Sequence, residues 1–87
     1  MLYHGTALER LPSIQQDGLR PMQRQQVHLT SNEKYAQTVA ASTGDYPIVL
    51  SVQAGDAFRA GVAFHQASCH VWLTDAVPPQ FISCNRN

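Results

Sequence analysis

The chain has 87 residues, of which 44% are hydrophobic and 14% are charged, and its formal net charge is zero. This composition is typical of one small globular domain, here residues 1–87, and excludes a disordered chain. Zero net charge also excludes a global basic field that would attract nucleic acid. No apolar run is long enough to span a membrane, and no charged lead with an apolar signal core opens the chain. We therefore expect a cytoplasmic protein.

The chain begins with a short apolar segment, Leu2–His4, which predicts a strand that Gly5 breaks into a turn. Apolar residues within 8–15 then recur at helical spacing. Gly18 follows this segment and is suited to cap a helix at its C-terminal end. A strand, a turn and a short helix are therefore expected before residue 20.

Val27–Leu29 predicts a second short strand. Thr30 stands three residues before Glu33, which is the spacing of a capping box at the start of a helix. Helical residues continue to about residue 43, where a Gly-Asp turn follows.

Pro47–Val52, with the sequence PIVLSV, is apolar enough to be a central strand of a sheet. A short helix is predicted over residues 54–60, ended by Gly61. Three further short strands follow, at residues 62–64, 71–74 and 81–83. The succession predicts a compact α+β domain with a small split sheet.

Two histidine motifs could carry chemistry. His4 precedes Gly5 and Thr6 where a strand is expected to end, so a ligand could approach the glycine backbone beside a hydroxyl group. His28 lies between two apolar residues of the second strand, four residues after Arg24, whose guanidinium is suited to bidentate phosphate recognition. The residues alone leave two alternatives open, a shared pocket or two solvated surface segments.

The cysteines and the remaining histidines do not predict a metal site. Cys69 and Cys84, with the two histidines at 65 and 70, match no standard zinc spacing. We expect reduced cysteines and no bound metal.

Several segments stand in a particular order: LYHGT, SI-x3-GL, PM-x-R-x2-VHLT, PIVL-x-V and VWLTDAVPPQFI. In this order and spacing they resemble the NAD-dependent RNA 2′-phosphotransferases of tRNA splicing. The resemblance is to the C-terminal, NAD-binding lobe of that family, and the family's N-terminal RNA lobe has no counterpart in these residues. Two departures are Gln26, where the family usually has histidine, and His65, which replaces a usual aromatic residue.

The resemblance implies the split-sheet fold of ADP-ribosyltransferases, expected here as two short sheets packed face to face. His4 and His28 would lie on neighbouring strands of one cleft, with NAD as co-substrate. Arg24 would engage the reacting phosphate, and with the two histidines it forms the implied catalytic set. The implied NAD-binding residues are His4, Gly5, Thr6, Ser13, Arg20, His28, Leu29 and Thr30.

The implied function is transfer of ADP-ribose from NAD to a phosphate of RNA or another nucleic acid, which removes the 2′-phosphate and gives a cyclic phosphate of ADP-ribose. Two alternatives remain open at this point. One is a stand-alone, toxin-like mono-ADP-ribosyltransferase that modifies nucleic acid or protein. The other is an NAD-binding module without turnover.

Overall fold

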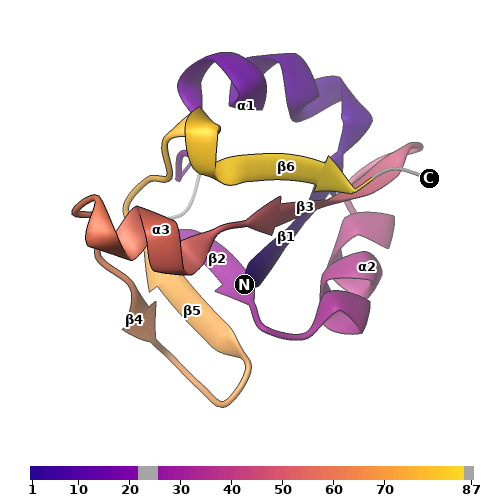
Figure 1. The fold of residues 1–87 in the computed structure, drawn as a ribbon. Coiled ribbons are helices and arrows are strands. Elements are labelled where there is room, and N and C mark those ends of the chain that lie inside the picture. Colours follow the sequence, from indigo (N-terminus) through magenta and orange to yellow (C-terminus); the bar gives the residue numbers. More distant parts are fainter. Residues whose placement is uncertain (22–25, 86–87) are drawn as a thin grey trace.

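The computed structural model describes residues 1–21 and 26–85. Figure 1 shows the elements within these ranges, which are, in chain order, β1 (Leu2–Ala7), the 3-10 turn η1 (Leu8–Arg10), α1 (Leu11–Asp17), β2 (Val27–Thr30), α2 (Glu33–Ala41), β3 (Pro47–Val52), α3 (Ala54–Arg59), β4 (His65–Gln66), β5 (Val71–Thr74), the 3-10 turn η2 (Pro79–Phe81) and β6 (Ile82–Asn85). The predicted α+β class is confirmed. No helix within the described ranges has the length and apolar content that crossing a membrane requires.

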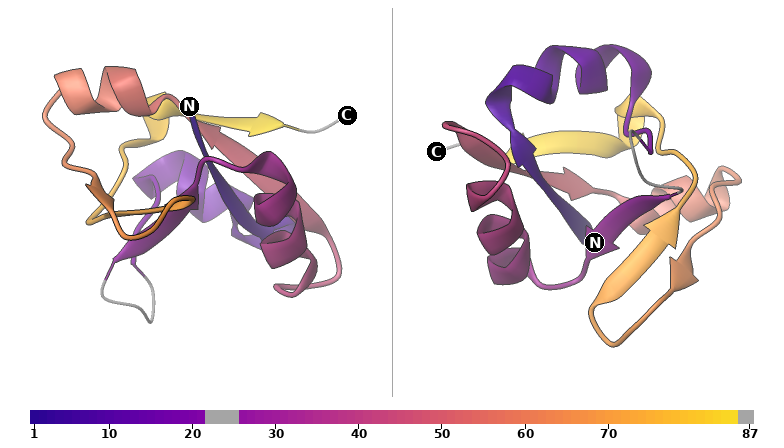
Figure 2. Two further views of the ribbon diagram at one scale, coloured as in Figure 1. Left: turned by 90° about the horizontal axis from the view of Figure 1, so that it is seen from below. Right: turned by 180° about the vertical axis from the view of Figure 1, so that it is seen from behind.

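The strands form one antiparallel sheet in the order β4-β5-β2-β1-β3-β6. β1 pairs with β3 along its whole length, but it meets β2 only at Tyr3 and Thr30. Figure 2 shows β1 and β2 running apart from this contact. We predicted two separate sheets. The correction is that this one contact joins the two halves into a single split sheet.

The central strand is confirmed, because β3 spans Pro47–Val52 as expected and has β1 and β6 on its two sides. Its side chains alternate between two apolar clusters. Ile48 and Leu50 belong to the larger cluster, which also contains Ile14 of α1. Val49 points the other way and packs against α2. A strand buried on both faces explains why its sequence is a continuous apolar run.

Helix α2 lies directly against β1 at Gly5. A Cβ atom at Gly5 would come within 2.2 Å of the carbonyl oxygen of Ala36 and 2.8 Å of the nitrogen of Ala40. The sequence predicted that Gly5 would end the strand in a turn, and this was wrong, because β1 continues to Ala7. Glycine at this position permits the close approach of a helix to the strand.

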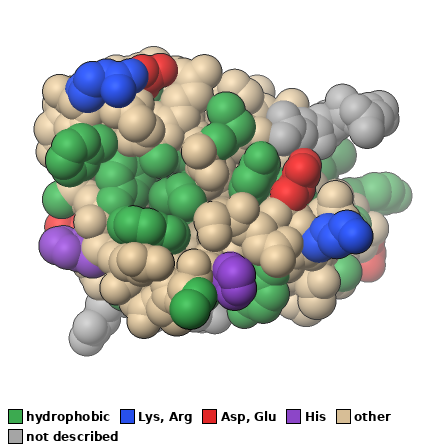
Figure 3. All heavy atoms as spheres, turned by 60° about the horizontal axis from the view of Figure 1, so that its bottom comes forward, with side chains coloured by type: hydrophobic (Ala, Val, Ile, Leu, Met, Phe, Trp, Pro, Cys, Tyr) green, Lys and Arg blue, Asp and Glu red, His purple; other side chains and the backbone are tan. Residues whose placement is uncertain are grey.

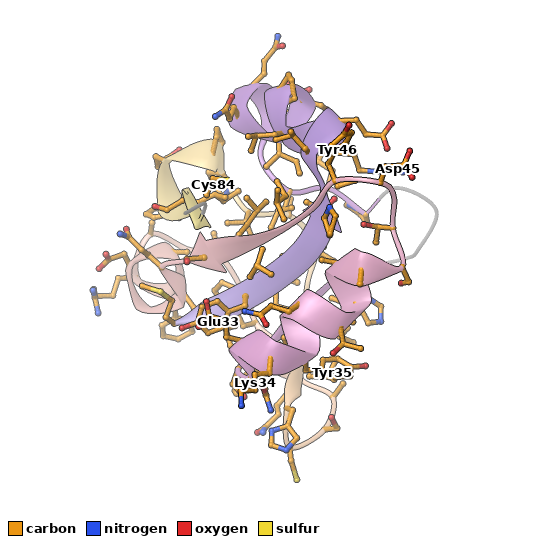
Figure 4. All side chains as sticks on the ribbon, turned by 90° about the vertical axis from the view of Figure 1, so that its right-hand side faces the viewer. Glu33, Lys34, Tyr35, Asp45, Tyr46 and Cys84 are labelled. Carbon is orange, nitrogen blue, oxygen red and sulfur yellow. The ribbon has the colours of Figure 1, made fainter. Side chains whose placement is uncertain are left out.

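The start of α2 also differs from the prediction. The capping residue is Asn32, whose Oδ1 accepts a hydrogen bond from the backbone N–H of Tyr35 at 3.1 Å. The expected capping residue, Thr30, belongs to β2, and its Oγ1 accepts from the N–H of Asn32 at 3.1 Å. These two bonds turn the chain from strand to helix, and Figure 4 shows Lys34 and Tyr35 at the outer surface of the first helical turn.

Two strands of the second half begin later than predicted. Residues 62–64 form no strand, because the segment still completes the end of α3, where the N–H of Val62 donates to the carbonyl of Ala57 at 2.9 Å. β4 follows at His65. The last strand begins at Ile82, since η2 occupies the three residues before it.

Both cysteines are free. Cys69 lies between β4 and β5, and Cys84 lies on β6 at the opposite edge of the sheet. The sheet order therefore keeps the two thiols too far apart for a disulfide within the chain. In the part of the chain that the structure describes, no three His, Cys, Asp or Glu side chains gather to hold a metal ion.

Candidate functional site

The candidate site lies where β1 and β2 part. His4 follows the Tyr3–Thr30 contact on one strand, and His28 lies two residues before that contact on the other. The expectation that the two histidines lie on neighbouring strands is confirmed by the strand order. The right-hand view of Figure 2 shows the ribbons of β1 and β2 diverging from their contact.

The two imidazoles start from different faces of the sheet. Paired residues of neighbouring strands share a face, so Tyr3 and Thr30 share one, and alternation places His28 on that same face and His4 on the other. The strands have separated at this point, and the ring of His4 crosses the opening. Its Nδ1 lies 2.9 Å from the carbonyl oxygen of His28. His4 thus bridges the split.

This contact fixes which nitrogen of His4 carries the proton. A carbonyl oxygen only accepts hydrogen bonds, so Nδ1 of His4 must donate, and Nε2 is then an acceptor while the ring is neutral. His28 is held in the same way, because its Nδ1 donates to the carbonyl oxygen of Gln26 at 3.1 Å. Among the described residues no hydrogen bond engages either Nε2 atom, so both are available to an external partner.

The surroundings of His4 favour its neutral form. Burial lowers the pKa of His4 below its ordinary value of 6.5, and the positive charges of His28 and Arg10 lower it further. The hydrogen bond to the carbonyl of His28 raises the pKa of His4, but this effect is smaller than that of burial. At neutral pH, His4 accordingly presents a hydrogen-bond acceptor and no charge.

The other residues of the first motif have different surroundings. Gly5 faces α2, and only its backbone groups could contact a ligand. Thr6 is buried, with 4% of its surface exposed. A ligand at the split would therefore meet the His4 ring and the backbone of this strand, with little access to the Thr6 side chain.

Three further residues were predicted to bind the ligand, and the structure does not bring their side chains to the histidine rings. Leu29 is buried in the large apolar cluster, and the Thr30 hydroxyl is bonded to the backbone at the start of α2. Ser13 is exposed on α1 and makes no hydrogen bond to either histidine within the described residues. Any contact from Leu29 would have to come from its main chain.

Arg20 lies at a separate open groove of about 520 Å³, whose lining includes neither histidine. Its neighbours there include Asp17, Thr74 and Asp75. Arg24 lies outside the described residues, so the structure does not test its predicted phosphate contact. Among the arginines that the structure describes, Arg10 is the one whose positive charge lowers the pKa of His4.

One contact at the site was not predicted. The side-chain Nε2 of Gln26 donates to Oδ1 of Asp75 at 3.3 Å, just beyond the Val27–Thr74 pair of β2 and β5. Knowledge of the β2–β5 pairing would have found it, because that register brings positions 26 and 75 together. No local motif connects two residues that are 49 positions apart in the chain.

An α+β domain with a split antiparallel sheet, carrying two imidazoles at the split, is compatible with the ADP-ribosyltransferase-like fold. The model of one protein family, described as RNA 2′-phosphotransferase, Tpt1 / KptA family, matches residues 1–76. That match covers most of the chain and both histidine motifs. The chain belongs to this family.

Individual relatives extend the match to nearly the whole chain. A probable RNA 2′-phosphotransferase of Herpetosiphon aurantiacus is 46% identical over 86 residues, which are 99% of this chain and 47% of that protein. Proteins of the same name are 43% identical in Bacillus thuringiensis (99% of this chain, 46% of that protein) and 47% identical in Pectobacterium carotovorum (93% and 43%). The chain spans about half the length of the curated relatives it matches.

Proposed function

We propose that this chain carries out NAD-dependent removal of a 2′-phosphate from RNA. The observation that carries the proposal is the family match over residues 1–76, which includes the two histidines at the split of the sheet. The relatives are named as probable RNA 2′-phosphotransferases, so an RNA acceptor is the first candidate.

The groups at the split have the hydrogen-bonding chemistry that NAD requires. NAD supplies an ADP-ribosyl group whose bond to nicotinamide can be broken, and its riboses and carboxamide offer hydrogen-bond donors. Neutral His4 accepts such a donor at Nε2, because its Nδ1 is committed to the carbonyl of His28. His28 presents its own Nε2 from the other strand, and the backbone of Gly5 lies beside them. This arrangement would hold NAD by the nicotinamide half.

The acceptor phosphate needs positioning and charge complementation. An RNA 2′-phosphate is already an anion at neutral pH, so it attacks without a general base. This explains why no carboxylate at the split is needed for the first step. We assign the phosphate contact to Arg24 from the family resemblance, and the charge of Arg10 supports it from the side of His4.

The proposed reaction has two steps. A phosphate oxygen forms a bond to the ribose carbon as the bond to nicotinamide breaks, and positive charge builds on the ribose as at other glycosidic centres. The neighbouring ribose hydroxyl then attacks the phosphorus, and the RNA oxygen leaves with the hydroxyl proton. The products are nicotinamide, RNA with a free 2′-hydroxyl and a cyclic phosphate of ADP-ribose.

Product analysis tests this proposal. The chain is incubated with NAD and a short RNA that carries one internal 2′-phosphate, and the products are separated by mass. We expect nicotinamide, dephosphorylated RNA and the cyclic phosphate in equal amounts. A stable ADP-ribosylated acceptor would instead indicate a mono-ADP-ribosyltransferase, and NAD binding without nicotinamide release would indicate a binding module.

A further inference from the structure

Three side chains form a row on the half of the sheet next to the candidate site. Leu73 of β5 pairs with His28 of β2 on one side and with His65 of β4 on the other. Residues paired across neighbouring strands point to the same face, so the three side chains stand on one face in the order His28, Leu73, His65. We call this row the imidazole platform.

The platform is open to solvent. His28 and His65 are exposed and Leu73 is half-buried. Helix α2 covers the same face of the sheet farther along, where it packs on β1 and β3 through Ala36 and Ala40. Figure 3, with the bottom of Figure 1 turned forward, shows histidine side chains at the molecular surface. The helix thus leaves the β4–β5–β2 half uncovered at this row.

The platform has the dimensions and chemistry of a stacking surface. Neighbouring strands lie about 4.8 Å apart, so His28 and His65 stand roughly 10 Å from each other with an aliphatic side chain between them. Rings on a sheet surface stack the bases of single-stranded RNA, with two or three bases on four strands. By the same proportion, three strands that carry two imidazole rings would stack one base.

A charge beside the platform gives the ligand a direction. Asp75 lies two residues beyond Leu73 and is held by Gln26, so it would repel a phosphate at that end. A nucleotide on the platform would therefore direct its phosphate away from Asp75. The platform is continuous with the candidate site, because His28 belongs to both.

We propose that the imidazole platform of His28, Leu73 and His65 binds one base of the acceptor RNA, next to the phosphorylated nucleotide. The inference rests on the proposed function for the identity of the acceptor. It goes beyond that function because it assigns a base-binding role to His65, which lies outside the NAD-binding set.

A binding experiment with two RNAs tests the platform. One labelled RNA carries a 2′-phosphate with normal bases, and the other has an abasic nucleotide beside the same phosphate. We expect His65→Ala to weaken binding of the first RNA about fivefold or more, the lower end of the range for one stacked base, and to leave binding of the second unchanged. His65→Phe should bind the first RNA at least as tightly as the unaltered chain. His70→Ala is the matched control, since His70 is an exposed histidine of the same hairpin outside the platform.

Several results would overturn the platform. Equal loss on both RNAs would indicate a general structural effect of the substitution. Loss of NAD affinity in His65→Ala, with RNA binding intact, would indicate that the platform binds a ring of NAD and not an RNA base. Normal turnover by the unaltered chain on both RNAs with equal affinity would refute the platform and leave the proposed function standing. If the unaltered chain neither binds nor converts the phosphorylated RNA, both proposals fail together.

Discussion

His4 and His28 are held in the same way although they stand on different strands. In each ring Nδ1 donates to a carbonyl oxygen in or next to β2, and no hydrogen bond among the described residues engages Nε2. The sequence and the family resemblance predicted that these two histidines would lie on neighbouring strands, and the strand order confirms it. The sequence could not predict the tautomers, because the partner of His4 is a main-chain atom 24 residues away.

Replacing His4 by alanine should weaken NAD binding. The substitution removes the neutral acceptor at Nε2, and a hydrogen bond of this kind contributes roughly 1–3 kcal/mol, which corresponds to about a tenfold or greater loss of affinity. Calorimetric titration of NAD measures the loss, with His70→Ala as a control. Unchanged affinity in His4→Ala would place NAD elsewhere on the molecule.

The lowered pKa of His4 also predicts how stability depends on pH. In the unfolded chain His4 takes a proton near its ordinary value of 6.5, whereas in the folded chain it takes one only at lower pH. The unfolded state thus binds more protons in this window, so the free energy of unfolding decreases as pH falls from about 7.5 through 6.5 toward the folded-state pKa. Urea unfolding across this range measures the effect, and His4→Gln should reduce the slope. An identical slope in both chains would contradict the shift.

Arg24 lies outside the described residues, and its prediction rests on the family resemblance and on guanidinium chemistry. Arg24→Ala should leave NAD affinity nearly intact and slow transfer to a phosphorylated RNA by at least about a hundredfold, the scale of a lost charge contact in the transition state. Arg24→Lys should recover little, because lysine keeps the charge but loses the planar fork. Single-turnover release of nicotinamide measures the rate, and a normal rate in Arg24→Ala would remove this residue from the mechanism.

At the scale of elements, the predictions were most accurate where the local sequence alone determines the secondary structure. The apolar run of β3 was predicted with its observed bounds, because burial on both faces leaves a clear pattern. The C-terminal end of β1 and the start of α2 were predicted wrongly. Gly5 continues a strand because a distant helix packs on it, and Thr30 belongs to a strand that pairs with β5. Such contacts are not encoded in the local sequence.

The surroundings of Gly5 and Gly55 predict opposite effects when each is replaced by alanine. Gly5→Ala would drive Cβ into the backbone of α2, which should lower the free energy of unfolding by about 2 kcal/mol or more. Gly55→Ala, within α3, meets no atom closer than 3.7 Å and should raise it by up to about 1 kcal/mol. Urea unfolding of the two variants gives both values. If Gly5→Ala were as stable as the unaltered chain, the close approach of α2 would be wrong.

At the scale of the whole molecule, the split sheet brings the two imidazoles to neighbouring strands where those strands part. The two halves are joined at one residue pair, and beyond it His4 bridges them through its hydrogen bond to the carbonyl oxygen of His28. The family resemblance predicted this fold and the neighbouring histidines. It did not predict that the halves form one sheet, because a single pair contact depends on the relative tilt of strands that no sequence pattern specifies.

The central claim is that NAD is held where β1 and β2 part. Nuclear magnetic resonance of the histidine rings during an NAD titration tests this claim most directly, because all four histidines are observed together in one experiment. We predict that the His4 and His28 signals shift in proportion to bound NAD, that His4 stays neutral with its proton on Nδ1, and that His70 does not respond. Saturation with NAD while the His4 and His28 signals remain unchanged would contradict the account.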